Sequence, residues 1–129
     1  MKKIKELYIV IENRPNSAGD LFRLLKKRNI SIYAAGIFLD AARLYVSDSA
    51  KALSLLQDNN YVVEEREVLM VNLPNREGAL MELTMKMGNA GINIHYLYGA
   101  LEPKQKIGTI IIEVDKPDLV VDIFRNHSF

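Results

Sequence analysis

The 129-residue chain contains no cysteine and only two histidines, His95 and His127. A disulfide framework, a thiolate zinc site and a cysteine nucleophile are therefore excluded, and two distant histidines offer too few ligands for another metal site. The sequence also has no glycine-rich phosphate loop of either common spacing and no nucleophile-elbow serine. We accordingly expect no metal and no cofactor.

An excess of one charge and long hydrophobic runs are missing as well. The 17 Lys and Arg residues are balanced by 16 Asp and Glu residues, which gives a formal net charge of +1 and no field to attract nucleic acid or an anionic membrane. No apolar run approaches the roughly 18 residues of a membrane-spanning helix, and no apolar segment follows the basic start to make a signal peptide. We therefore expect a cytoplasmic protein that binds neither nucleic acid nor membrane.

What the chain does contain is a repeat of itself. A displacement of 62 residues places Asn13-Arg14 on Asn75-Arg76 and Ile30-Ser31-Ile32 on Ile92-Asn93-Ile94 without a gap. Between these anchors, both copies follow the i, i+3, i+4, i+7 spacing of one helix face. The positions on this face are Ala18, Leu21, Phe22 and Leu25 in the first copy and Leu80, Leu83, Thr84 and Met87 in the second.

The ends of these helices and the segments around them also repeat. Asn29 and Gly91 occupy the same place after the helix, and both residue types tolerate the left-handed conformation that ends helices. A β-rich run precedes each helix, two more follow it, and a second amphipathic helix comes next, for which we expect Asp48 and Asp115 to be the N-caps. The predicted strands cover residues 7–11, 30–38 and 43–47 in the first half and 68–73, 92–101 and 108–114 in the second.

The two halves differ in how they end. Tyr61-Val62-Val63-Glu64 gives the first half a closing strand, which completes the β-α-β-β-α-β order of a ferredoxin-like fold with two helices on one face of an antiparallel sheet. Only Asn126–Phe129 follow the last helix of the second half, so we expect its last strand to be missing or truncated and its sheet to have an unpaired edge or to borrow a strand. The predicted class is α+β, with repeats at residues 1–65 and 66–129 joined by Glu64-Glu65-Arg66.

The strand-to-helix loop, residues 11–16 and its copy 73–78, is the repeated feature best suited to bind a ligand. Backbone N–H groups at the start of a helix lack hydrogen-bond partners, and the positive end of the helix dipole lies there. A carboxylate can therefore bind at this position. A neighbouring asparagine, Asn13 or Asn75, can hold an ammonium or a carboxylate through its amide. The alternative is that both asparagines only cap or turn the chain.

The loops and the turns after the helices resemble the motifs of the ACT domain family. These motifs are Glu12-Asn13-Arg14-Pro15 and Asn29-Ile30-Ser31-Ile32 in the first half, and Asn75-Arg76-Glu77-Gly78 and Gly91-Ile92-Asn93-Ile94 in the second. Because they occur twice at one spacing over about residues 5–126, the chain looks like a stand-alone tandem ACT protein without a catalytic domain. The resemblance implies a regulatory module that binds an amino acid, or a similar small ligand, where two ACT domains meet.

The resemblance also suggests which residues bind the ligand. In serine-binding members, the contacts come from the loop asparagine of one domain and from the asparagine in the Gly-Ile-Asn-Ile turn of its neighbour. In this sequence these positions are Asn13 or Asn75 in the loop and Ser31 or Asn93 in the turn. We expect Asn13 opposite Asn93 to be the better site, because that pair keeps both amides.

Several positions depart from the family pattern. Where the loop usually has Pro-Gly, the first copy has Pro15-Asn16 and the second has Glu77-Gly78, and glycine there lets a ligand approach the backbone closely. We expect Asn16 to narrow the first pocket and Glu77 to repel a carboxylate from the second. Ile11 replaces a histidine of some serine-binding members, which favours an apolar ligand such as leucine, isoleucine, valine or phenylalanine.

The short length of the segment between the two halves predicts a partner chain. If the halves of one chain joined through their second strands, the strands that Glu64-Glu65-Arg66 connects would lie roughly 29 Å apart, whereas this segment spans about 14 Å. The interface must therefore form between chains, or the halves pack differently, or the strand from Tyr61 to Leu73 is shared between the sheets. We predict a homodimer in which halves of different chains make the ligand sites, and a regulated enzyme as a further partner.

Other functions are compatible with some of these features. One is a small enzyme that uses Arg14 or Arg76 on an anionic substrate, and another is an interaction module with a vestigial pocket. Tyr8, Tyr33 and Tyr45 suggest an RNA-binding sheet, but no Arg/Lys-Gly-aromatic third strand accompanies them. We favour a non-catalytic sensor whose bound amino acid shifts the population of domain arrangements.

Overall fold

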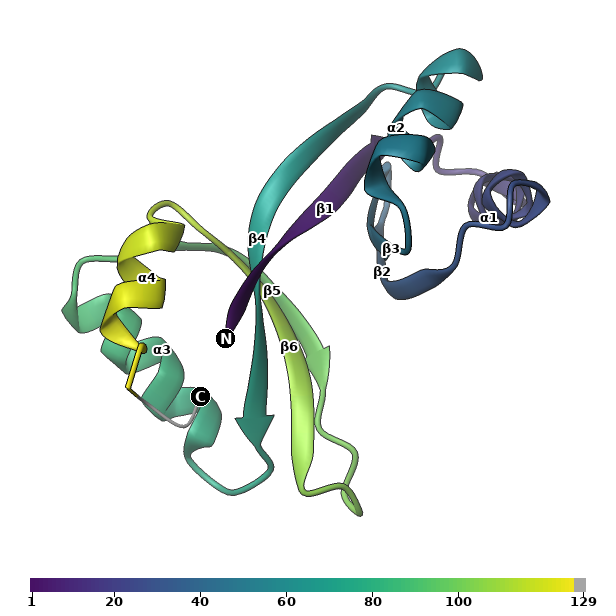
Figure 1. Ribbon diagram of the computed structural model, residues 1–129. Helices are drawn as coiled ribbons and strands as arrows, with labels where there is room; N and C mark the ends of the chain where they lie inside the picture. The colour runs from purple at the N-terminus through teal and green to yellow at the C-terminus, as the bar shows by residue number, and fades with distance from the viewer. Residues whose placement is uncertain (127–129) are drawn as a thin grey trace. The chain divides into compact units, whose positions relative to one another are not determined.

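The computed structural model describes residues 1–126, and the remaining residues, including His127, lie outside the described part. Six strands and four helices alternate along these residues (Figure 1). Within the described part no helix is long and apolar enough to cross a membrane. The elements are β1 (Lys2–Val10), α1 (Ser17–Lys27), β2 (Ile32–Phe38), β3 (Ala41–Val46), α2 (Ser49–Asp58), β4 (Val63–Pro74), α3 (Ala79–Asn89), β5 (Ile94–Ala100), β6 (Ile107–Val114) and α4 (Pro117–Ile123).

The chain forms two compact units, each with its own antiparallel sheet and its own pair of helices. The first unit contains Lys5–Arg66, and its strands are ordered β2-β3-β1-β4. The second unit contains the chain from Glu67 onward together with Met1–Ile4, and its strands are ordered β5-β6-β4-β1. The predicted α+β class with two ferredoxin-like repeats is confirmed.

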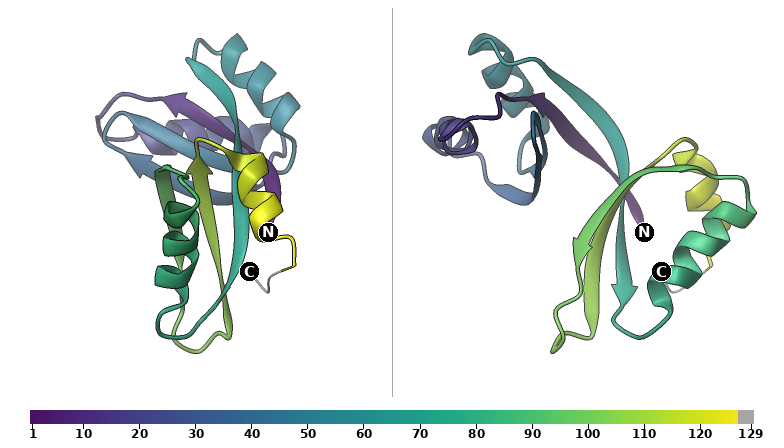
Figure 2. Two further views of the ribbon diagram at one scale, coloured as in Figure 1. Left: turned by 90° about the vertical axis from the view of Figure 1, so that its left-hand side faces the viewer. Right: turned by 180° about the vertical axis from the view of Figure 1, so that it is seen from behind.

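Each unit buries a core between its sheet and its helices. Figures 1 and 2 show α3 and α4 together on one face of β4, β6 and β5. The helix faces predicted from the repeat point into these cores except at Leu80, which is 37% exposed because Ala79 takes the buried position at the start of α3. The four central residues of these faces are fully buried. These residues are Leu21 and Leu25 on α1, and Leu83 and Met87 on α3.

Helices α1 and α3 end in the same way, as their sequences predict. Asn29 has a φ of 57° and Gly91 a φ of 76°, so both adopt the left-handed conformation just after the helix. In each case the backbone N–H of the following residue donates to a carbonyl five residues back, at 3.1 Å. This is the hydrogen bond of a Schellman motif, which satisfies a carbonyl in the last turn.

The predicted junction between the halves is part of a strand. Glu64-Glu65-Arg66 lies inside β4, a single strand of 12 residues whose first part belongs to the first unit and whose later part belongs to the second. The sequence analysis allowed three arrangements: an interface between chains, a different packing of the halves, or a strand shared between the sheets. The structure contains the shared strand. The side chains of this polar run are mostly exposed, while its backbone is extended.

The second unit borrows its fourth strand from the start of the chain. Met1 packs against the core of this unit, and the Nζ of Lys3 lies 2.7 Å from Asp118 Oδ1 and 3.6 Å from Glu67 Oε1. The prediction of a borrowed strand is therefore confirmed. Pairing with β1 satisfies a sheet edge that would otherwise be open.

One predicted helix cap is correct and the other is wrong. Asp48 caps α2 and accepts a hydrogen bond from the Lys51 backbone N–H at 3.0 Å. In the second unit the N-cap is Lys116, followed directly by Pro117, and Asp115 lies one residue too early to cap α4. Its carboxylate instead accepts from the Asn93 backbone N–H at 3.0 Å, which fixes the entry to β5.

The borrowed strand generates a stability prediction. In a chain that starts with Met immediately before Lys5, the β4 residues from Glu67 onward lose β1 as a neighbour. We expect faster hydrogen exchange at the amides of residues 67–70, which lie beside the start of β1, measured by mass spectrometry. The control is Lys3→Ala, which removes only exposed ion pairs and should leave the protection of these amides close to that of the wild type. Unchanged protection of residues 67–70 in the shortened chain would refute a stabilising role for this strand.

Candidate functional site

The loop between β1 and α1 places most of its side chains at the surface. Glu12, Asn13 and Asn16 are exposed, whereas Ile11 is only 6% exposed and belongs to the core of the first unit. Asn16 is the N-cap of α1 and has a φ of 69°, and its copy Gly78 is the N-cap of α3 with a φ of 85°. A positive φ is tolerated best by glycine and asparagine, so the backbone explains why these two residue types share the position.

The two loop asparagines, which the repeat makes equivalent, have different surroundings. The Nδ2 of Asn75 donates to the carbonyl oxygens of Glu102 at 2.9 Å and Gln105 at 2.8 Å. The backbone N–H of Asn75 donates to the carbonyl oxygen of Lys106 at 2.9 Å. Asn75 thereby fastens the longer β5–β6 turn to its own unit. The Asn13 side chain makes no hydrogen bond to any residue of the described chain, so its amide is available to a ligand.

The turns that precede β2 and β5 keep their backbones fixed and their side chains exposed. The Ser31 backbone N–H donates to Ser47 Oγ at 2.9 Å, as that of Asn93 does to Asp115. Neither the Ser31 hydroxyl nor the Asn93 amide is hydrogen-bonded within residues 1–126. Both turns therefore present a polar side chain on a fixed backbone.

Loop and turn of one unit lie at opposite ends of a helix. In the first unit, the 11 residues of α1 separate Asn13 from Ser31, a length of about 16 Å at 1.5 Å per residue. In the second unit, α3 separates Asn75 from Asn93 in the same way. A small ligand cannot bridge that distance, so a site with both groups requires two different ACT domains.

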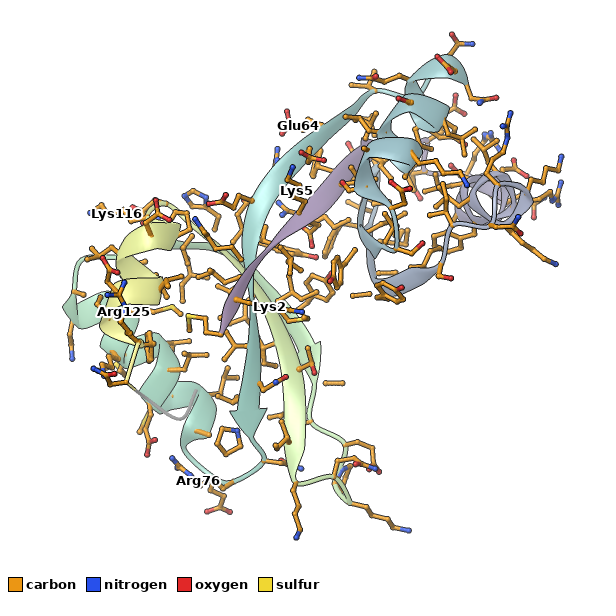
Figure 3. All side chains as sticks on the ribbon, in the orientation of Figure 1. Lys2, Lys5, Glu64, Arg76, Lys116 and Arg125 are labelled. Atoms are coloured by element: carbon orange, nitrogen blue, oxygen red, sulfur yellow. The ribbon has the colours of Figure 1, made fainter. Side chains whose placement is uncertain are left out.

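Both loop arginines are paired with carboxylates of their own unit. Arg14 Nε donates to Glu12 Oε2 at 2.8 Å, and its Nη1 lies 3.7 Å from Asp20 Oδ2. Arg76, labelled in Figure 3 at the outer end of the β4–α3 loop, makes two hydrogen bonds to Glu82, at 2.7 and 3.1 Å. Hydrogen bonds and charge from Glu12 raise the pKa of Arg14, and the bond from Arg76 lowers the pKa of Glu82. An anionic substrate would have to compete with these carboxylates.

Of the three tyrosines considered for base stacking, Tyr8 is covered by cations. The guanidinium carbons of Arg66 and Arg43 lie 4.1 and 5.2 Å from the ring centroid of Tyr8. Arg43 also donates to the fully buried Glu6 at 3.1 Å. The other two, Tyr33 and Tyr45, pack edge to face with ring centroids 5.5 Å apart. The Tyr8 ring is therefore not a free platform for nucleic-acid bases.

A cavity of about 360 Å³ lies beside the first loop. It is lined by residues 10–12, Arg14, Ser17 and residues 59–62, all of which belong to the first unit. Ile11 is the one predicted site residue in its wall. The wall also contains Ser17 and residues 59–62, for which the sequence analysis made no prediction.

Two ferredoxin-like units in tandem define a paired small domain of the kind that the ACT family contains. The family model described as an ACT domain pair matches residues 2–127, so this chain belongs to that family. ACT domains are regulatory modules rather than catalytic ones. A search of curated proteins finds no match for the chain.

Solved structures share this fold. Protein BT0572 from Bacteroides thetaiotaomicron is 26% identical, with a TM-score of 0.85 over 95% of this chain and 87% of that one. The regulatory subunit of aspartate kinase from Thermus thermophilus is 12% identical, with a TM-score of 0.66 over 100% of this chain and 99% of that one. A putative C-terminal regulatory domain of aspartate kinase from Porphyromonas gingivalis is 6% identical, with a TM-score of 0.65 over 99% and 95% of the two chains.

The different environments of the loop asparagines generate a second prediction. Asn75→Ala removes two hydrogen bonds that hold the β5–β6 turn, and we expect it to lower the free energy of unfolding by about 1–3 kcal/mol. Asn13→Ala is the matched control and should change it by less than about 0.5 kcal/mol, because its side chain holds nothing within the described chain. Urea denaturation of both variants measures the difference. Equal losses would contradict the distinct roles.

Proposed function

We propose that this chain is a non-catalytic regulatory protein that binds an amino acid at the β1–α1 loop of one chain and the β5 turn of a second copy. The observation that carries the proposal is the exposed, unengaged amide of Asn13 in a chain of the ACT domain pair family. Asn93 would supply the second amide from the partner copy. The structures with this fold include regulatory subunits of aspartate kinase, which supports an enzyme as the regulated partner.

The contrast between the two loops favours Asn13 over Asn75 as the ligand contact. Both Asn75 amide hydrogens are donated to the turn at Glu102 and Gln105. A ligand at that loop would therefore have to break contacts that hold its own unit together. The better site, in this proposal, is the one that pairs Asn13 with Asn93.

The edges of the two sheets support a homodimer. β2 is the edge strand of the first unit and β5 that of the second. Large apolar side chains are exposed on β2 and just after it: Tyr33 at 63%, Ile37 at 43% and Leu39 at 77%. An apolar edge strand readily pairs with another chain, and such pairing would bring a loop and a turn from different chains to one ligand.

The ligand prediction is tested by thermal unfolding with each of the twenty amino acids at millimolar concentration. A ligand that binds only the folded state at 100 times its Kd adds about 2.7 kcal/mol of stability, and we expect this from branched-chain or aromatic amino acids. Asn13→Ala and Asn93→Ala should each reduce the shift, whereas Asn75→Ala should keep it. A panel without any stabilising amino acid would refute the proposed function.

The homodimer is tested by light scattering at micromolar concentration, where we expect the mass of two chains. Ile37→Lys places a charge on the β2 edge and should shift the protein toward the monomer, because an edge lysine opposes strand pairing. The control is Leu119→Lys on α4, a residue of similar exposure (39%), which should leave the dimer intact. A monomeric wild-type protein would contradict this part of the proposal.

A further inference from the structure

A groove between α1 and α2 lies on the surface of the first unit, outside the proposed ligand site. It consists of two cavities, of about 320 and 190 Å³. The lining of the first includes Lys27 and Asn59, and the lining of the second includes Arg28 and Asp58, the adjacent residue in each case. The Nζ of Lys51 donates to the Arg28 carbonyl at 2.6 Å, which joins the end of α1 to the start of α2. The two cavities therefore adjoin each other, and together they are called the α1–α2 groove below.

Positive charge dominates the α1–α2 groove. Four cationic side chains and two carboxylates line it. The cations are Arg23 and Lys27 in the first cavity and Arg28 and Lys51 in the second, and the carboxylates are Asp20 and Asp58. Arg23 lies 4.0 Å from Asp20, whereas the Lys27 and Arg28 side chains make no hydrogen bond or ion pair within residues 1–126. The groove thus presents cations whose charge the first unit does not neutralise.

The second repeat lacks this pattern of charge. The four equivalent positions of α3 and α4 hold no cation, and they are occupied by Met85, Asn89, Ala90 and Asp118. Both repeats nevertheless form the same elements, so the fold does not need cations at these places. A cation in the last turn of a helix stabilises the helix, but Lys51 lies in the first turn of α2, where the helix dipole disfavours it. The cations of the groove therefore indicate an interaction outside the unit.

The spacing of the cations matches an extended acidic peptide. Arg28 follows Arg23 on the sequence at a distance of about 7.5 Å along the helix axis. Alternate side chains of an extended chain lie about 7 Å apart and point to the same side, so carboxylates at alternate positions can reach both cavities. Ser54 and Asn59 also line the groove, and a hydroxyl and an amide can hydrogen-bond to a peptide backbone.

The two carboxylates favour a peptide over a nucleic acid. Asp20 lies in the first cavity and Asp58 in the second, and each of them repels a phosphate. A peptide carries backbone N–H donors between its charged side chains, and these can donate to an aspartate. Single-stranded nucleic acid is bound through bases stacked on aromatic rings. The aromatic residue among those that line the groove is Tyr61, which packs against the core of the first unit.

We infer that the α1–α2 groove is a docking surface for an acidic segment of a partner protein. Arg23 and Lys27 bind carboxylates at one end of the groove, and Arg28 and Lys51 bind carboxylates at the other. The attraction acts between exposed charges, so it speeds association and weakens with salt. This inference goes beyond the proposed function, because the groove is formed within one unit and requires no bound amino acid.

The test is a titration of fluorescein-labelled hexaglutamate with the full-length chain at low ionic strength, followed by fluorescence anisotropy. We expect binding that weakens as salt is added. In Arg23→Gln/Lys27→Gln the affinity should fall about fivefold or more, because two exposed charge pairs are lost. Both positions are exposed, and glutamine has nearly the helix propensity of arginine and lysine. The variant should therefore fold normally, which circular dichroism checks.

Three controls separate the groove from the overall charge of the protein. Lys104→Gln/Lys106→Gln removes the same charge from the exposed β5–β6 turn and should bind hexaglutamate like the wild type. Labelled hexaglutamine has no carboxylates and should not bind. Arg28→Gln alone should weaken the binding of hexaglutamate about twofold, because the Arg28 guanidinium lines the second cavity.

Equal affinity of the wild type and Arg23→Gln/Lys27→Gln for hexaglutamate, or no binding by the wild type, would overturn the inference. Labelled oligothymidylate of the same length is the nucleic-acid probe. If it binds more tightly than hexaglutamate and loses affinity in the same variant, the groove is assigned to nucleic acid and the inference fails. These outcomes leave the proposed function untouched, because stabilisation by amino acids is measured separately. A loss of hexaglutamate binding confined to the groove variants supports the docking surface.

Discussion

The backbone of β4 needs hydrogen-bond partners along its length, and this requirement organises both units. Its first residues close the sheet of the first unit beside β1, its residues around Glu67 lie beside the start of β1, and Leu69–Pro74 pair with β6. One pair of long strands thus supplies the first and fourth strands of both ferredoxin-like sheets. The helices, cores and loops of each unit are built on strands that the other unit also uses.

On this shared framework the two repeats keep one backbone and use it differently. Asn16 and Gly78 give both helices the same start, and Asn29 and Gly91 give them the same end. The two repeats differ in side chains that do not determine this backbone conformation. Asn75 fastens a longer turn of its own unit, whereas Asn13 points to solvent with its amide unengaged. In a duplicated domain, the loop of one repeat can stabilise its own unit because the loop of the other repeat keeps an exposed amide.

The sequence predicted correctly the features that depend on interactions between residues close together in the chain. Helix faces and the left-handed residues after the helices depend on a few neighbouring positions, and these predictions were confirmed. Asp115 was assigned wrongly because an aspartate before a helix can cap it or serve a neighbouring strand, and only the tertiary pairing with Asn93 decides. The different surroundings of Asn13 and Asn75 could not be predicted, because their motifs are alike and the partners of Asn75 lie 27 and 30 residues further along the chain.

The β1–α1 loop of the proposed site lies next to the point where the two shared strands meet. Val10, the last residue of β1, donates its N–H to the carbonyl of Val62 at 2.9 Å, one residue before β4 begins. A ligand changes a protein's arrangement only by binding one arrangement more tightly than another. The β1–α1 loop begins where β1 ends, so the proposed ligand would contact the chain at the end of this strand pair. The regulatory proposal therefore requires that the ligand bind this loop more tightly in one arrangement than in another.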